Sequence, residues 1–232
     1  MRMRNKKWAR PELAACPYFV DDPESVQGKW QEQFARPQPL HVELGCGKCV
    51  STAQMALDNP DVNFLAVDLV CSVLGVGRRN IEAAYAGRTV DNLVLTHFDI
   101  MWIEKYLAPE DRVDRIIISF CNPWNQKSSQ AKRRLTHPRQ LMQYRAFLRP
   151  GGEIHFKTDD DNLFRVSRTY LRTCGFEEIY CTEDLHGDQE ALSRFAHYES
   201  EHEKRYAAEG VPIKFLAARM TRLPSEADEP SA

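Results

Sequence analysis

The sequence contains no long apolar segment. A membrane-spanning helix needs a run of about 18 or more apolar residues, and no such run occurs; nor does an apolar stretch follow the basic N-terminus, as it would in a secretory signal. The seven cysteines are odd in number and lack the spacing of a disulfide framework. These absences exclude a membrane protein and argue against a secreted one, so we expect a cytoplasmic protein with free thiols.

A metal-ligand pattern is also lacking. Cys46 and Cys49 form one C-x-x-C pair, but a zinc site needs about four ligands and no second pair is present. The aspartates at 159–161 are not expected to bind a metal, because adjacent residues seldom converge on one ion; Asp160 and Asp161 are better placed to cap the following helix. We therefore expect no metal site, and the position of the cysteine pair inside another motif disfavours a redox role.

Net charge is small, at −2, so the field of the whole molecule gives no reason to expect a nucleic-acid partner. Basic residues nevertheless gather in two places, the first ten residues and the segment 127–139. A basic run is more often a solvated face than a phosphate site, but two runs in one domain keep both interpretations open. The residues are Arg2, Arg4, Lys6, Lys7 and Arg10 in the first cluster, and Lys127, Lys132, Arg133, Arg134 and Arg139 in the second.

Short apolar runs alternate with segments of helical periodicity along most of the 232 residues. This alternation predicts βαβ units, one large α/β domain and a mainly parallel sheet. Two late strands joined by a long connection are expected to pair antiparallel at one edge. Strands are predicted at 39–44, 62–69, 92–96, 113–120, 153–157, 176–181 and 213–220, and helices at 51–57, 73–85, 138–148, 163–174 and 198–208. We divide the chain into a basic N-terminal arm and helix (1–36), the main domain (37–223) and a flexible acidic tail (224–232).

Polar side chains follow four of these strands where each strand ends. Glu43, Asp68, Asp99 and Asn122 should therefore share the rim formed by the carboxyl ends of the parallel strands, where ligands of such sheets bind. Each of these groups, taken alone, is more often a cap or a solvated strand end. Their recurrence at successive strand ends favours a binding site.

The first of these strands ends in a glycine turn, with Gly45 and Gly47 able to let a ligand approach the backbone closely. A dinucleotide site would require a third glycine where Val50 stands, and a P-loop would require Ser or Thr after Lys48. A ligand with an amino acid portion, a sulfonium and a ribose suits the carboxylates better. Glu43 would face the amino acid portion, Asp68 the ribose hydroxyls and Asp99 the adenine amine, which is the logic of an S-adenosylmethionine site.

The chain resembles the bacterial tRNA guanine-N7 methyltransferases. The resemblance runs through MRMRNKKWA (1–9), HVELGCGK (41–48), NFLAVD (63–68), NPW (122–124), AKRRLTHP (131–138), GGEIHFKTD (151–159) and AHYESEHEKRYAAEG (196–210). It implies a Rossmann-like class I methyltransferase fold, with a mainly parallel seven-stranded sheet, helices on both faces and an antiparallel edge strand. It also implies S-adenosylmethionine as the methyl donor and tRNA as the acceptor, methylated at guanine 46 of the variable loop.

Family roles follow only where motifs match. Glu43, Gly45, Gly47, Asp68 and Asp99 match the positions that bind the cofactor. The family motif Asp-Pro-Trp-Pro-Lys, whose Asp is credited with cofactor contact and catalysis, begins here with Asn122. The positions credited with holding the guanine are matched by Asp159, Ala196, His197, Tyr198 and Glu199, and the Lys of the family motif falls on Lys127 in the substrate site. Apart from these matches, Lys127, Lys132, Arg133 and Arg134 are expected to position tRNA through phosphate contacts.

The chain departs from the family pattern in several motifs. The loop after Trp124 is one residue longer, Ser129 and Gln130 replace a common Arg-His pair, Cys49 replaces a glycine and Ala196 replaces a threonine. Trp124 itself has two open interpretations, stacking on a base or packing against its own loop.

The asparagine at position 122 bears on the chemistry. Guanine N7 carries an in-plane lone pair and acts as an acceptor, so methyl transfer needs orientation more than a general base. Asn122 offers one acceptor oxygen where the carboxylate offers two. We expect a slower enzyme, with a catalytically weakened binding homologue or a different RNA or nucleotide acceptor as alternatives. The tRNAs accepted, the choice between monomer and homodimer, and the ordering of the N-terminal arm on RNA stay open.

Overall fold

The computed structural model describes residues 5–195 and 198–223. Within these residues the chain forms one sheet of eight strands, with α-helices and short 3-10 helices (η) between them. The strands are β1 (Phe19–Val20), β2 (Leu40–Leu44), β3 (Asn63–Asp68), β4 (Leu93–His97), β5 (Val113–Ser119), β6 (Leu148–Thr158), β7 (Phe176–Thr182) and β8 (Lys214–Met220). The helices are α1 (Ala9–Ala14), α2 (Val50–Asp58), α3 (Cys71–Tyr85), α4 (Pro138–Phe147), α5 (Asp161–Thr173), α6 (Gln189–Arg194) and α7 (Glu201–Ala208), with η1 (Trp30–Gln33), η2 (Ile100–Lys105), η3 (Pro109–Asp111) and η4 (Ser128–Arg133).

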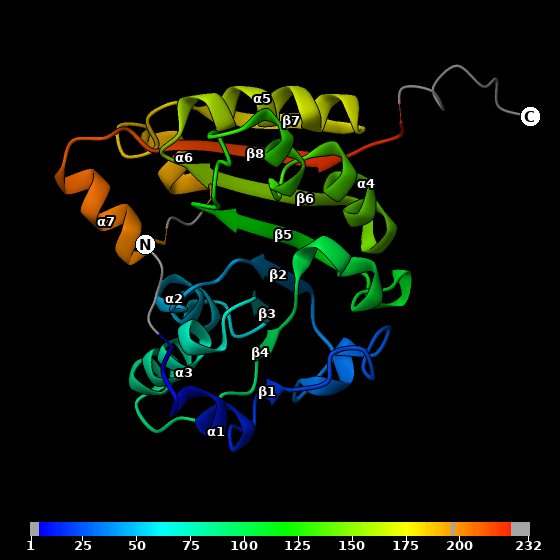
Figure 1. Cartoon of the computed structure of the whole chain (residues 1–232), viewed down its shortest axis with the longest axis vertical. Helices are drawn as coiled ribbons and strands as arrows, with labels where there is room; N and C mark the ends of the chain where they lie inside the picture. Colours follow the sequence, from blue (N-terminus) through cyan, green and yellow to red (C-terminus); the bar gives the residue numbers. More distant parts are fainter. Residues whose placement is uncertain (1–4, 196–197, 224–232) are drawn as a thin grey trace, which may run out of the picture.

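The strands lie in the order β1-β4-β3-β2-β5-β6-β8-β7, and Figure 1 shows the sheet running from β7 at the top to β1 at the bottom. β8 pairs antiparallel with β6 and β7, whereas the other pairs are parallel. The strand order reverses at β2, which lies between β3 and β5. The carboxyl ends on either side of this reversal form the rim that carries the site.

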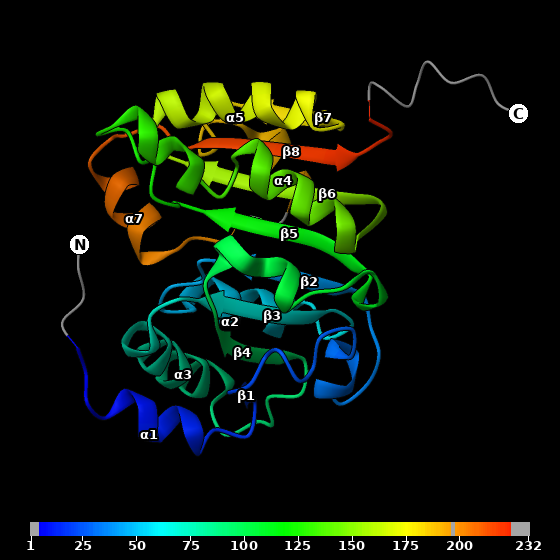
Figure 2. The same ribbon diagram turned by 45° about the vertical axis from the view of Figure 1, so that its right-hand side comes forward.

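Alternation along the strands divides the core between the two faces of the sheet. On one face, alternate residues such as Val42, Val67 and Ile116 pack with α4 and α5. On the other face, Phe64 and Ala66 pack with α2 and α3. Helices α6 and α7 cover the β8 end of this second face through a smaller apolar cluster. Figures 1 and 2 place α7 beyond the carboxyl ends of β5 and β6.

The sequence predictions and the structure agree on the seven longer strands and differ in detail. The eighth strand, β1, has only two residues, too few for a periodic pattern to mark it. The antiparallel strand β8 lies one place in from the edge, because β7 pairs along its outer side. Helix α7 begins at Glu201, three residues later than expected, with Ser200 accepting a hydrogen bond from the Glu203 amide as its N-cap.

The segment expected as a basic arm packs closely on the domain from about residue 8 onward. Helix α1 lies against α3, and β1 pairs with β4. Trp30 is fully buried, and its indole Nε1 donates to the Tyr106 carbonyl oxygen (2.7 Å). The expectations for Arg2, Arg4 and the tail 224–232 fall outside the described residues.

Two further findings concern bilayers and thiols. Across the described residues, no helix combines the length and apolar character needed to cross a bilayer. The seven cysteines all fall in the described part of the chain, and all are free thiols.

The contact between α1 and α3 depends on Gly75. A Cβ at this position would lie 2.5 Å from Ala9 Cβ and 3.0 Å from Ala9 Cα. We expect Gly75→Ala to lower the stability by about 1–3 kcal/mol through overpacking, although alanine is the better helix former. Thermal unfolding of Ala83→Gly, an exposed site in the same helix, provides the control, because alanine should be the more stable residue there. Equal or higher stability of Gly75→Ala would contradict the packing argument.

Candidate functional site

The turn after β2 leaves its backbone open to a ligand. Gly45 and Gly47 have φ angles of +83° and +57°, which glycine adopts without strain, and a Cβ on either would meet no atom within 4 Å. The amides of Gly45 and Cys46 both donate to the Val67 carbonyl oxygen, at 2.8 and 3.0 Å. This anchors the turn to β3. Cys49 also has a positive φ (+54°), the conformation for which a glycine is favoured.

Asp68 joins the end of β3 to the glycine turn. Its Oδ2 accepts from the Gly47 amide (3.1 Å) and its Oδ1 from the Val70 amide (2.9 Å). Burial raises the pKa of Asp68 above its ordinary value, against the lowering effect of these amides. The two residues that follow, Leu69 and Val70, are unusually exposed for apolar side chains, at 59% and 43%. They form an apolar surface beside Asp68 that the sequence analysis did not identify, although their place directly after a strand-end carboxylate could have marked it.

Glu43 is the most buried carboxylate of the rim, with 3% of its surface exposed. The Thr52 hydroxyl donates to its Oε2. Burial raises the pKa of Glu43 to about 7, with the Thr52 hydrogen bond and the charge of Lys157 acting in the opposite direction. The carboxyl group is therefore poised to gain or lose a proton near neutral pH.

Asp99 lies two residues after the end of β4, and Asn122 lies three residues after the end of β5. Both side chains accept hydrogen bonds within local turns. Asp99 Oδ1 accepts from the Met101 amide (3.0 Å) and so caps η2. Asn122 Oδ1 accepts from the Trp124 amide (3.0 Å), and its side chain is exposed. Its oxygen thus uses one of its two lone pairs within the turn.

The longer loop after Trp124 is fastened by Asn125. The Asn125 amide nitrogen donates to Asp160 Oδ2 (2.7 Å), and its oxygen accepts from Arg134 (2.9 Å). Asp160 also accepts from the Leu163 amide (2.6 Å), which confirms it as the cap of α5. Asn125 therefore links the loop after β5 to the start of α5.

Arg134 is buried, unlike its basic neighbours. It is 6% exposed, and its guanidinium also donates to the Pro123 carbonyl oxygen (2.7 Å), so it holds the loop from inside and is not positioned to contact a phosphate. Lys127, Lys132 and Arg133 are exposed. The guanidinium of Arg133 lies over the ring of Trp124, 5.2 Å from its centroid.

A cavity of about 230 Å³ connects the glycine turn with α7. Lys48 of the turn forms an ion pair with Glu201 at the start of that helix. His202 lies next to Phe120, with ring centroids 4.7 Å apart, and its Nε2 lies 3.4 Å from Asp159 Oδ1. The sequence analysis did not identify α7 as part of the rim, because only the folded chain brings these distant segments together. Lining residues are Glu43, Gly45, Cys46, Gly47, Lys48, Cys49, Val50, Ser51, Ser119, Phe120, Ser200, Glu201 and His202.

The segment before α7 is held by Lys157 of β6. Lys157 Nζ donates to the Tyr198 carbonyl oxygen and to Glu203 Oε2, both at 2.8 Å, and Glu203 is fully buried. The Asn59 side chain donates to Tyr198 Oη (3.1 Å). Glu199 Oε1 lies 3.8 Å from His186 Nδ1. Ala196 and His197, which share the expected motif, lie outside the described residues.

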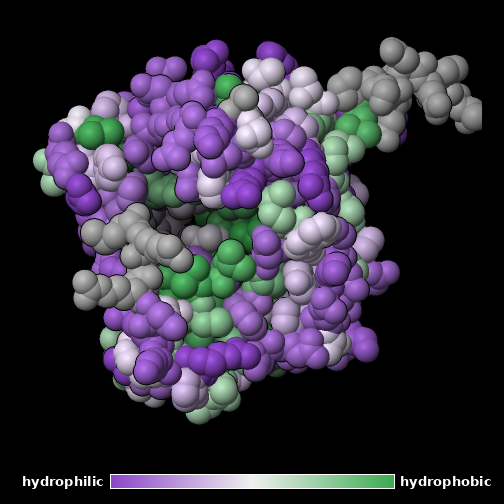
Figure 3. Space-filling model, in the orientation of Figure 1, coloured by the Kyte–Doolittle hydropathy of each residue, from purple (hydrophilic) through white to green (hydrophobic). Residues whose placement is uncertain are grey.

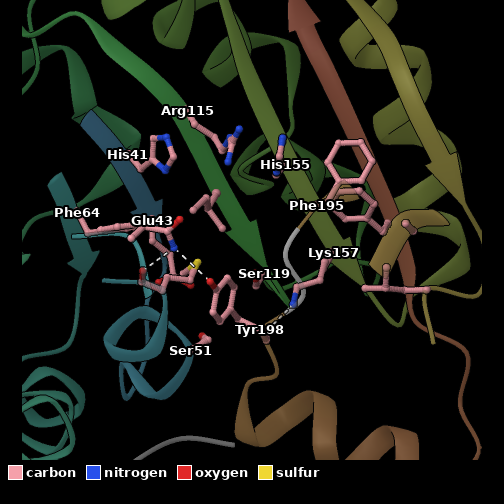
Figure 4. Close-up of a pocket in the computed structure, with 16 residues that line it drawn as sticks. His41, Glu43, Ser51, Phe64, Arg115, Ser119, His155, Lys157, Phe195 and Tyr198 are labelled. Atoms are coloured by element: carbon pink, nitrogen blue, oxygen red, sulfur yellow. Dashed lines mark hydrogen bonds between the residues drawn. The ribbon is translucent and has the colours of Figure 1, made fainter. Parts of the chain in front are cut away.

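A second cavity of about 90 Å³ continues along the sheet face and shares Glu43, Ser51 and Ser119 with the first. Figure 4 shows Ser51, Ser119 and Tyr198 at one end of it and His41, Arg115 and His155 at the other. Figure 3 shows a hollow with hydrophobic residues beside it, at the place where Figure 1 has α7, the end of β5 and α2. The remaining lining residues are Met55, Asn59, Phe64, Ile117, Lys157, Leu185, Ala191, Phe195 and Phe215.

The charges at the deep end of this second cavity are balanced. Burial lowers the pKa of His41 to about 3 and that of His155 to about 4, so both rings are neutral at pH 7. Arg115 is paired with Glu153 (3.4 Å), whose pKa is lowered to about 2 chiefly by its hydrogen bond with His155. The deep end therefore has no unpaired positive charge to attract an anion.

Metal binding finds no support in the geometry of residues 5–195 and 198–223, where no group of three or more His, Cys, Asp or Glu is placed to hold an ion.

Comparison with known proteins decides the family. Residues 37–216 match a family model described as "Putative methyltransferase". A tRNA (guanine-N(7)-)-methyltransferase of Clostridium beijerinckii is 48% identical over 220 residues, which cover 94% of this chain and 98% of that protein. The chain belongs to the tRNA (guanine-N(7)-)-methyltransferase family. A member of the same name from Acetivibrio thermocellus is 46% identical over 220 residues, covering 94% of this chain and 99% of its own.

Solved structures agree with the fold that this family membership implies. The 16S rRNA methyltransferase KamB superposes with a TM-score of 0.58 at 14% identity, covering 83% of this chain and 91% of its own. A 16S rRNA (adenine(1408)-N(1))-methyltransferase from Catenulisporales acidiphilia, solved with SAM, has a TM-score of 0.54 at 14% identity and covers 87% of this chain and 92% of its own. The expected Rossmann-like class I fold is confirmed.

The raised pKa of Glu43 predicts a pH-dependent stability. A carboxyl group whose pKa rises from 4.5 to about 7 on folding stabilises the folded chain below pH 4.5 and loses that contribution as the pH passes 7. We expect the wild type to lose ~3 kcal/mol relative to Glu43→Gln between pH 4.5 and pH 8. Melting temperatures across this range test it, with Glu32→Gln, an exposed site, as the control. Parallel pH profiles for the wild type and Glu43→Gln would contradict the burial argument.

Proposed function

We propose that the protein transfers a methyl group from S-adenosyl-L-methionine to guanine N7 of tRNA, at variable-loop position 46. The observation that carries the proposal is the first cavity, because it joins an open glycine turn to the α7 region that follows the substrate motif. Relatives that span nearly the whole chain are named tRNA (guanine-N(7)-)-methyltransferases, which supports the same reaction.

The residues of the rim fit the methyl donor. S-adenosyl-L-methionine supplies a methyl group on a positively charged sulfur. The open backbone at Gly45 and Gly47 suits the amino acid portion, with Glu43 offering a buried carboxylate to its ammonium group. Asp68 suits the ribose hydroxyls, and the exposed Leu69 beside it suits the apolar face of the adenine. Asp99, which follows β4, is assigned to the adenine amine.

The reaction needs orientation and a dry site more than proton transfer. N7 of guanine has a lone pair in the ring plane and loses no proton when it is alkylated, so no general base is required. Asp159, Tyr198 and Glu199 are assigned to the guanine, together with Ala196 and His197. Lys157 supports this role indirectly, since it fixes the Tyr198 backbone. Asn122 then acts by hydrogen bonding close to the reacting base, and Lys127 by contact with the RNA.

A second candidate function follows from the engagement of Asn122. Its single acceptor oxygen already receives the Trp124 amide, so only one lone pair is left here where a carboxylate would offer a second oxygen to guanine N1–H and N2–H. A homologue that binds cofactor and RNA with weakened catalysis would have this arrangement. A methyltransferase with another acceptor would have it as well.

Methylation of unmodified tRNA tests the proposal directly. Purified protein, unmodified tRNA and methyl-labelled S-adenosyl-L-methionine should give N7-methylguanosine, and aniline cleavage should map it to the variable loop. Cofactor binding without label in any tRNA under single-turnover conditions would favour the binding homologue. Label at another nucleotide would favour the different acceptor.

Asn122→Asp tests the missing carboxylate. One oxygen of an aspartate would still accept from the Trp124 amide, as the Asn122 oxygen does. The second oxygen would be available to the guanine, and such a charge-assisted hydrogen bond is worth ~1.5–3 kcal/mol. We expect kcat/KM to rise roughly ten- to a hundredfold. Asn162→Asp, which adds the same charge at an exposed position nearby, should leave kcat/KM unchanged. An unchanged rate in Asn122→Asp would mean that the site works without the charge.

A further inference from the structure

Trp102 is a large aromatic side chain left on the surface. It lies in η2, three residues after the cap residue Asp99, and 48% of its surface is exposed. Its backbone angles (φ −121°, ψ 33°) interrupt the helix, so η2 is kinked at this residue. An exposed indole offers a large aromatic surface to an outside partner.

Two cations flank the ring. Lys105 Nζ lies 5.8 Å and the Arg139 guanidinium 5.6 Å from the centroid of Trp102, and both basic side chains are exposed. Lys105 belongs to η2 and Arg139 to the first turn of α4, so two separate elements supply the charges. Aromatic rings interleaved with Lys and Arg are typical of surfaces that bind RNA, because bases stack on the rings and phosphates pair with the cations.

The surrounding charge is one-sided. Residues 127–139 contain five Lys or Arg and no Asp or Glu, in a chain whose net charge is −2. This stretch includes η4 and the start of α4, with Lys132, Arg133 and Arg139 exposed. The acidic neighbours are Glu104 of η2 and its cap residue Asp99. These cations are complementary in charge to a polyanion. An apolar protein partner would leave them without counter-charges.

The two elements are packed firmly together. Gln140 of α4 is fully buried, and its amide nitrogen donates to the Ile100 carbonyl oxygen (2.9 Å) and contacts Met101 Sδ (3.6 Å). The backbone segments that carry Trp102 and Arg139 are therefore joined by direct contacts. Figure 2 shows α4 on the side of the molecule that faces the viewer.

We propose that Trp102, Lys105 and Arg139, here called the Trp102 surface, bind tRNA outside the target nucleotide. Trp102 stacks on an unpaired base, while Lys105 and Arg139 pair with the flanking phosphates. Lys132 and Arg133 continue this contact toward the target guanine. The proposal rests on the proposed function, because it takes tRNA as the substrate and adds the surface that holds it.

The test compares variants in two assays on the same preparations. One assay measures binding of fluorescently labelled, unmodified tRNA by anisotropy, and the other measures initial methylation rates across tRNA concentrations. We expect Trp102→Ala and Arg139→Ala each to weaken tRNA binding and raise KM about tenfold with kcat nearly unchanged. Trp102→Phe and Arg139→Lys should recover most of the affinity. The slope of binding against salt should fall by about one for Arg139→Ala.

Controls separate this surface from the cofactor site and from general loss of charge. Arg88→Ala removes an exposed cation between α3 and β4, at the opposite ends of the strands, and should leave KM unchanged. Affinity for S-adenosyl-L-methionine, measured by calorimetry, and the melting temperature should be the same in all the variants. Because Arg139→Ala leaves the indole in place, it tests the surface even if Trp102→Ala folds poorly.

The outcomes are distinct. If the wild type methylates tRNA and the variants bind tRNA within twofold of it, the Trp102 surface is not a tRNA contact. If the wild type binds tRNA without methylating it, the proposed function fails while the binding assay still tests the surface. If the wild type binds no tRNA, the surface proposal is overturned together with the function.

Discussion

The reversal of strand order at β2 is the constraint on which the site depends. Connections on its two sides leave the sheet in opposite directions, so a crevice opens beyond the carboxyl ends of β2, β3 and β5. The glycine turn after β2 occupies this crevice and is anchored to β3 through the Val67 carbonyl oxygen. The positions of Glu43 and Asp68 follow from that arrangement, because each is the polar residue at the end of a buried strand.

Lys157 connects this crevice to the C-terminal part of the chain. Its ammonium group satisfies the Tyr198 carbonyl oxygen and the fully buried Glu203. A buried carboxylate that loses its cation carries a large desolvation cost. Replacing Lys157 alone would therefore destabilise the packing of α7, which carries Glu203. Lys157 thereby joins the Tyr198 backbone and α7 to the end of β6, beside the crevice.

Much of the fold and part of the site could be predicted from the sequence. Apolar runs in the sequence mark the seven longer strands. The positions of Glu43, Asp68 and Asp99 at or just after strand ends mark them as candidate site residues. Other features depend on contacts between distant segments. Nothing in a basic run distinguishes the buried Arg134, and no local pattern brings the glycine turn to α7. The two-residue β1 is visible only through its pairing with β4.

The two edges of the sheet have a consequence for the behaviour of the molecule in solution. An exposed edge strand presents unpaired backbone groups on which another chain can add a strand. At one edge β1 is only two residues long, and at the other β7 carries the exposed carboxylates of Glu177 and Glu178. Glu178 is paired with Arg168 of α5 (2.8 Å). A short edge and an edge with charged side chains are both poor templates for strand addition. The two edges therefore disfavour aggregation through the sheet.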